Sequence, residues 1–69
     1  MSVLQVNGKK YEFSDGIPGS LAELLDHLNI TRSTVVAELD GEIVQPDAFA
    51  VTVLKSGQSI ELIRFVGGG

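Results

Sequence analysis

Four leucines at helical spacing constrain the fold of this chain most strongly. The four are Leu21, Leu24, Leu25 and Leu28. They occupy positions i, i+3, i+4 and i+7, so a helix places them all on one face, which must be buried. Ser20 precedes them and Glu23 follows Ser20 by three residues, which is the pattern of a capping box at a helix start. Elsewhere the apolar segments are short. The sequence therefore predicts one main helix packed on a sheet.

The chain has 69 residues and no cysteine, which indicates one small domain without disulfide bonds. A domain of this size buries only about 60% of its unfolded surface, so little remains for an enclosed active-site cavity. The net charge of −4 disfavours binding to nucleic acid and to anionic membranes. Neither a secretory leader nor an apolar stretch of about 20 residues is present. We expect a soluble, cytoplasmic protein whose partners are proteins.

Two hairpins are predicted from alternating segments around Asx-Gly pairs. In the first, residues 3–13 alternate on both sides of Asn7-Gly8, a pair that favours a type I′ turn. In the second, residues 35–44 form a strand and a short return around Asp40-Gly41. Pro46 ends that return, because proline cannot continue a paired strand.

The last third of the chain contains one ambiguous segment and one clear strand. Residues 48–54 are compatible with either a short helical turn or a strand. Ser56-Gly57 then forms a turn into a final strand over residues 59–66. The order of elements predicts an α+β fold in which one helix covers a mixed sheet.

Alternation along the final strand predicts an exposed apolar patch. If Ile60 and Leu62 face the helix, Ile63 and Phe65 point to the opposite side of the sheet, which meets water. The alternative is that a bulge switches the faces and buries Phe65.

Residues that could support catalysis or metal binding are few. His27 is the only histidine, so a two-histidine metal site is impossible, and we assign His27 no role. Glu38, Asp40 and Glu42 cluster in sequence, and we interpret them as a solvated acidic edge rather than a metal site. The glycine-containing segment 16–20 lacks the lysine and spacing of a phosphate-binding P-loop. No catalytic residue and no metal ligand are predicted, and the chain is not expected to be an enzyme.

Three glycines follow the final strand. Gly67, Gly68 and Gly69 contribute no side chain to packing, so we predict a domain over residues 1–66 and a flexible tail over residues 67–69. In one interpretation this tail simply frays or is an expression scar. In the other, it extends about 10 Å, at ~3.3 Å per residue, and carries a carboxylate into a slot of a partner enzyme that activates it with ATP.

Four segments of the chain together resemble the ThiS family, the ubiquitin-like sulfur carriers of bacterial thiamine biosynthesis. They are residues 4–9, 20–25, 36–44 and 64–69. The resemblance spans essentially the whole chain. It implies a β-grasp (ubiquitin-like) roll and a carrier that needs no metal or bound cofactor, with ATP used by its partner.

The resemblance also implies the chemistry and the partners. An E1-like, ThiF-like enzyme adenylates Gly69, and sulfur from a cysteine desulfurase converts it to a thiocarboxylate. A ThiG-like thiazole synthase then receives that sulfur. Gly67 and Gly68 form the narrow segment that passes through the partner's slot, while Ile63, Phe65 and Val66 contact the partner.

Several alternatives share part of this chemistry. They are a sulfur carrier for molybdopterin or cysteine synthesis and a ubiquitin-like protein modifier. A further alternative, from a different class, is a plain interaction module whose tail is inert. Proline commonly precedes the terminal segment of the molybdopterin carriers, whereas Phe65-Val66 stands there in this chain. Deleting Gly68 and Gly69 separates a carrier from an interaction module, because only the carrier loses its function.

Overall fold

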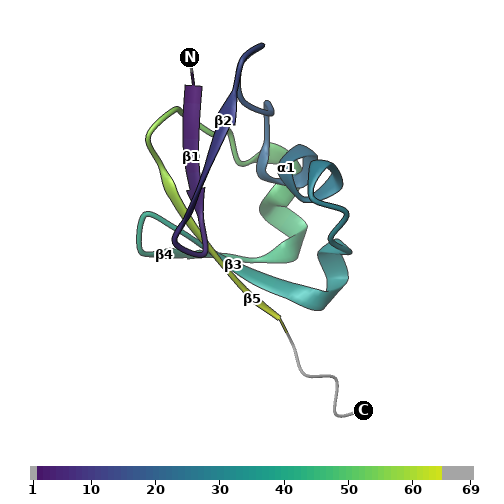
Figure 1. Ribbon diagram of the computed structural model, residues 1–69. Helices are drawn as coiled ribbons and strands as arrows, with labels where there is room; N and C mark the ends of the chain where they lie inside the picture. The colour runs from purple at the N-terminus through teal and green to yellow at the C-terminus, as the bar shows by residue number, and fades with distance from the viewer. Residues whose placement is uncertain (1, 65–69) are drawn as a thin grey trace.

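The computed structural model describes residues 2–64, which form a mixed sheet with one α-helix across one face (Figure 1). The sheet order is β2-β1-β5-β3-β4, and β1 and β5 are parallel while the other neighbours are antiparallel. This arrangement confirms the predicted α+β fold. The elements are β1 (Ser2–Val6), β2 (Lys9–Phe13), α1 (Leu21–His27), the 3₁₀ helix η1 (Arg32–Thr34), β3 (Val35–Leu39), β4 (Glu42–Val44), the 3₁₀ helix η2 (Pro46–Val51) and β5 (Ser59–Arg64).

Both predicted hairpins are present. Asn7 and Gly8 join β1 to β2 with φ angles of 52° and 79°, and Asp40 and Gly41 join β3 to β4 with 49° and 90°. Two successive positive φ angles are typical of the type I′ turn, which suits the right-handed twist of the paired strands. Asparagine and aspartate tolerate this left-handed conformation better than most residues with a side chain.

The helix begins as the sequence predicts. Ser20 is the N-cap, and its Oγ accepts a hydrogen bond from the Glu23 backbone N–H at 3.2 Å. The Glu23 carboxylate turns back toward the same residue, where its Oε2 accepts from the Ser20 hydroxyl at 3.3 Å. The Ser20 hydroxyl thus accepts from the Glu23 N–H and donates to the Glu23 carboxylate, whereas in a full capping box that carboxylate would accept from the Ser20 backbone N–H.

The ambiguous segment over residues 48–54 forms no strand of the sheet. It continues η2 as far as Val51, and an isolated bridge then pairs Val53 with Ser20. Phe49 lies in η2 and is completely buried. Among the described residues it belongs to a core of eleven buried apolar residues, which are Leu4, Val6, Leu21, Ala22, Leu24, Leu25, Val35, Ala37, Phe49, Leu54 and Ile60.

The final strand lies at the centre of the sheet. In the structure β5 ends at Arg64, and residues 65 and 66 of the predicted strand lie outside the described residues. The three glycines of the predicted tail also lie outside them, so the division into 1–66 and 67–69 stays a prediction. Because β5 has neighbours on both sides, the segment that follows it starts from the middle of the sheet rather than from its edge.

Candidate functional site

The strand β5 is predicted to contact the partner. Over its described residues, alternate side chains point to opposite faces of the sheet, as expected. Ile60 is fully buried and Leu62 is partly buried against the core, whereas Ile63 points to the opposite face and is 51% exposed. Phe65 and Val66 lie outside the described residues, as do Gly67, Gly68 and Gly69. Whether Phe65 extends the exposed patch or is buried by a bulge is therefore still a prediction.

Two neighbouring strands enlarge the apolar surface around Ile63. Val36 on β3 lies directly opposite Ile63, between the buried residues Val35 and Ala37. Ile43 on β4 is 54% exposed on the same outer face. We call this face of β3, β4 and β5 the outer patch, and Val36, Ile43 and Ile63 are its apolar residues. Sequence reasoning found only Ile63, although the same alternation, applied to β3 and β4, would have found the other two.

Two carboxylates lie within the outer patch. Glu38 on β3 is directly opposite Glu61 on β5, and on its other side it is opposite Ile43. Within residues 2–64 the only ion pair joins Lys10 to Glu12 on β2, so neither carboxylate of the patch has a cationic partner there. Like charges directly opposite one another destabilise a sheet. The outer patch therefore presents an apolar surface with a local excess of negative charge.

The turns of the two hairpins position β5. On one edge, the Asn7 backbone N–H donates to the Ile60 carbonyl at 2.8 Å, and the Leu62 N–H donates to Asn7 Oδ1 at 2.7 Å. On the other edge, Asp40 makes an equivalent pair of bonds with Ser59. Each turn residue thus uses both its backbone and its side chain to hold the strand. Sequence reasoning identified the turns but not these bonds.

The acidic residues near the second turn do not gather into a metal site. Among residues 2–64 no group of three histidine, cysteine or acidic side chains is arranged to hold a metal ion. Asp40 instead accepts a hydrogen bond from the backbone N–H of Ser59, which lies 19 positions away on another strand, rather than from a group within its own turn. His27 lies beside Phe13, with ring centroids 5.5 Å apart and planes tilted by 58°.

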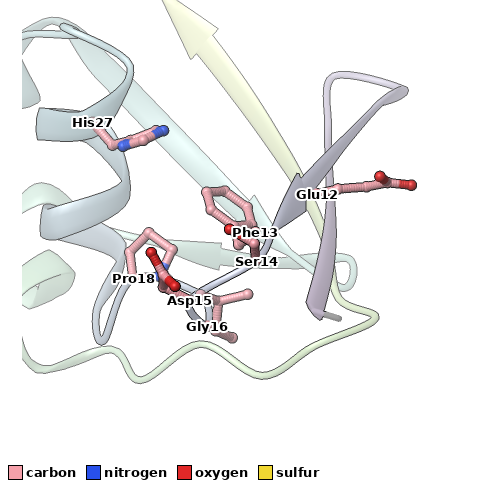
Figure 2. A pocket seen from close by; sticks show the side chains of 8 residues that line it. Glu12, Phe13, Ser14, Asp15, Gly16, Pro18 and His27 are labelled. Atoms are coloured by element: carbon pink, nitrogen blue, oxygen red, sulfur yellow. The ribbon is translucent and has the colours of Figure 1, made fainter.

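A surface pocket of about 390 Å³ lies where β2 leads into the loop before α1 (Figure 2). It is lined by Glu12, Phe13, Ser14, Asp15, Gly16, Ile17, Pro18 and His27. Figure 2 shows the Glu12 carboxylate directed away from the other labelled side chains. Because β1 is parallel to β5 and Phe13 pairs with Ser2, this pocket lies at the opposite end of the sheet from Arg64. Sequence reasoning did not predict it.

The described part of the chain contains no helix that is long and apolar enough to cross a membrane.

The arrangement of the sheet and helix matches solved structures of one class. The crystal structure of the thiamine biosynthesis protein ThiS from Geobacter metallireducens is similar with a TM-score of 0.82 and 35% identity, over 97% of this chain and 99% of that one. Its solution structure gives a TM-score of 0.76 at 36% identity, over 100% of this chain and 88% of that one. The fold is therefore that of the β-grasp, ubiquitin-like carriers, as predicted.

Sequence comparison identifies the family. The ThiS family model matches residues 4–69. The sulfur carrier protein ThiS of Bacillus subtilis (strain 168) is 30% identical over 67 residues, which cover 97% of this chain and all of that protein. The chain belongs to the ThiS family, the sulfur carriers of thiamine biosynthesis.

A much longer relative also matches. A thiazole synthase of Paramagnetospirillum magneticum (strain ATCC 700264 / AMB-1) is 30% identical over 66 residues, which are 96% of this chain. The chain spans only 20% of the length of that relative, so the similarity concerns one part of the longer protein.

Proposed function

We propose that this protein carries sulfur as a thiocarboxylate on Gly69 and donates it for thiazole formation in thiamine biosynthesis. The observation that carries the proposal is the family match, which extends through all three glycines to residue 69. In this role the chain is the substrate of an E1-like adenylating enzyme and is not itself an enzyme. The partner uses ATP, and the carrier holds no cofactor of its own.

The proposed chemistry starts with the poor reactivity of a carboxylate. One oxygen of the Gly69 carboxylate attacks the α-phosphorus of ATP, pyrophosphate leaves, and an acyl-adenylate forms. A sulfur nucleophile supplied by a cysteine desulfurase then attacks the carbonyl carbon and displaces AMP. That nucleophile is the outer sulfur of a persulfide, so the first product is an acyl disulfide. A thiol such as cysteine then attacks the donor's sulfur in the S–S bond, forms a disulfide with the donor and releases the Gly69 thiocarboxylate, whose sulfur is the nucleophile for the next transfer.

Glycine suits the reacting position for a steric reason. Gly67, Gly68 and Gly69 lack Cβ atoms, so a partner can enclose the backbone closely along the whole approach to the carbonyl. The folded domain supplies recognition at a distance from the reacting atoms, and that binding energy can then be used to orient the terminal carbonyl.

The outer patch is the surface that we assign to partner recognition. It extends over β3, β4 and β5, the last of which leads into residues 65–69, and Val36, Ile43 and Ile63 form its apolar part. We further propose that Phe65 and Val66 anchor the chain at the entrance of the partner's slot. A complementary partner surface would be apolar and would carry a cation facing Glu38 and Glu61.

We propose a ThiF-like activating enzyme and a ThiG-like thiazole synthase as the two main partners. The similarity to part of a protein named thiazole synthase supports the second assignment. A segment of this kind within the same polypeptide as the acceptor would have a high effective concentration near the site of sulfur transfer.

Intact-protein mass spectrometry tests the proposed function. The protein is incubated with ATP, an E1-like activating enzyme of the family, a cysteine desulfurase and cysteine. We expect a mass gain equal to the exchange of one oxygen for sulfur, which should be absent when Gly69 is deleted. A chain that gains no sulfur while a control carrier is modified in the same mixture would contradict the proposal.

The acceptor is tested separately. The purified thiocarboxylate is mixed with a thiazole synthase and its other substrates, and loss of the sulfur from the carrier is followed by mass. Sulfur that is retained here but lost to a molybdopterin or cysteine synthesis enzyme would reassign the pathway while leaving the carrier chemistry intact.

A further inference from the structure

The backbone groups of β5 alternate between its two neighbouring strands, and the hydrogen bonds on one side identify which residues of β5 face β1. The Gln5 N–H donates to the Gln58 carbonyl at 3.0 Å, just before β5 begins. The Asn7 N–H donates to the Ile60 carbonyl at 2.8 Å, and the Leu62 N–H donates to Asn7 Oδ1 at 2.7 Å. Even-numbered residues of this strand therefore direct their backbone groups to the β1 side.

This alternation identifies an open strand edge at the end of β5. The strand β1 ends at Val6, and the side chain of Asn7 supplies one further acceptor, for the Leu62 N–H. The next groups on this side are the Leu62 carbonyl and the Arg64 N–H. Among residues 2–64 no strand lies beside them, whereas on the other side β3 continues to pair as far as Arg64. Figure 1 shows β5 running past the turn between β1 and β2.

We propose that this open edge, the Leu62 carbonyl and the Arg64 N–H, binds an extended main-chain segment of the activating enzyme. The inference rests on the proposed function and adds a mode of recognition to it. The enzyme segment adds a strand to the sheet beyond β1, in the position where β1 would continue if it were longer.

The position of the edge favours this occupant over others. It lies immediately before residues 65–69, so a strand bound there fixes the direction in which the chain leaves the domain. Within residues 2–64 this edge of β5 has only two open backbone groups, which is too little for a stable sheet between two copies but enough to set the register of a chain held elsewhere. The outer patch supplies the side-chain contacts, because it lies on a face of the sheet and the open groups lie in its plane.

Main-chain recognition also fits the composition of the segment that follows. Gly67, Gly68 and Gly69 offer no side chains, so a partner can distinguish this segment only through its backbone. A partner strand that begins pairing at Leu62 and Arg64 would establish such backbone contacts before the glycines are reached.

Chemical synthesis of the chain with an N-methyl group on the Arg64 backbone nitrogen tests the proposal. The methyl group removes the open N–H and blocks strand addition, while the odd-numbered residues keep the groups that pair with β3. We expect kcat/KM for adenylation to fall roughly two- to tenfold or more, the value of one hydrogen bond, with an unchanged thermal midpoint. The controls are the unmethylated synthetic chain and Arg64→Ala, which changes the side chain and keeps the N–H.

Three outcomes overturn the inference. If the methylated chain is adenylated as fast as the unmethylated one, the edge is unused and the proposed function stands. If the unmethylated chain is not adenylated at all, both the function and the inference fail. If methylation instead abolishes a self-association seen by sedimentation, the occupant of the edge is a second copy.

Hydrogen exchange on the unmodified protein gives a second test that does not depend on how the methylated chain folds. We expect the Arg64 amide to exchange rapidly in the free protein and at least tenfold more slowly in the complex with the activating enzyme. The Ile63 amide, on the β3 side, serves as the internal reference. Unchanged exchange at Arg64 in a saturated complex would overturn the proposal.

Discussion

Two hydrogen bonds join Asp40, in the turn after β3, to Ser59, the first residue of β5. The Asp40 backbone N–H donates to the Ser59 carbonyl at 2.8 Å, and the Ser59 N–H donates to Asp40 Oδ1 at 2.9 Å. Asn7 holds the opposite edge of β5 through its own N–H and Oδ1. Two turns that are distant in sequence therefore fix the same strand, and that strand leads to the proposed reactive end.

Replacing Asp40 by alanine tests this arrangement. Asp40→Ala removes the acceptor for the Ser59 N–H and places alanine at a φ of 49°, which alanine adopts less readily than aspartate. We expect a loss of about 1–2 kcal/mol in the free energy of unfolding, measured by urea titration.

Two further variants at the same position separate the causes. Asp40→Asn keeps both the acceptor and the tolerance of positive φ, so it should lie within about 0.5 kcal/mol of the parent. Asp40→Gly keeps only the tolerance of positive φ, and should fall between the other two. Equal stability of the alanine and asparagine variants would show that the bond to Ser59 contributes nothing.

The paired carboxylates of the outer patch predict a variant that gains stability. Glu38→Gln removes one of two like charges that lie directly opposite, so the free energy of unfolding should rise by about 0.2–1 kcal/mol at low salt. Added salt should reduce the gain, because it screens the repulsion in the parent. Glu12→Gln is the matched control, since it breaks the surface ion pair with Lys10 and should produce no gain. A gain that is independent of salt would exclude charge repulsion as the cause.

Removal of the capping side chain of α1 should lower the free energy of unfolding by the amount typical of an N-cap. Ser20→Ala removes the acceptor for the Glu23 N–H and should lower the free energy of unfolding by about 1 kcal/mol. Ser33→Ala changes an exposed serine in η1 and should lie within about 0.5 kcal/mol of the parent. Both are measured by chemical denaturation. Indistinguishable results for the two variants would mean that the cap does not stabilise the helix.

Substitutions in the outer patch should weaken binding to the partner without destabilising the fold. Ile63→Ser and Ile43→Ser remove exposed side chains from the proposed partner surface, so each should weaken binding to the activating enzyme by roughly tenfold while changing the thermal midpoint little. Val51→Ser is the matched control, because Val51 is 78% exposed and lies on η2, away from the outer patch. Calorimetric titration gives the affinities. Equal losses in all three variants would indicate non-specific apolar binding rather than a defined patch.

Much of the fold follows from local sequence patterns. The Asx-Gly pairs, the leucine spacing and the Ser20 cap each act within a few residues, so the hairpins and α1 could be predicted without knowledge of the tertiary structure. The exposure of Ile63 followed from alternation alone.

The features that the sequence left open depend on contacts between distant segments. Phe49 is buried because η2 packs against α1, and nothing in residues 48–54 themselves decides between a helical turn and a strand. The bond from Leu62 to Asn7 joins residues that are 55 positions apart, and the pocket beside His27 arises where a strand, a loop and a helix meet. Such relationships are set by packing, which local patterns do not encode.

The central position of β5 has a mechanical consequence. Its hydrogen bonds to β3 run perpendicular to the strand and those to β1 are slanted, so a pull on Arg64 along the strand axis would load both sets together, in shear, rather than one bond after another. The domain is thus built to resist force at the point where a partner would grip and draw the chain.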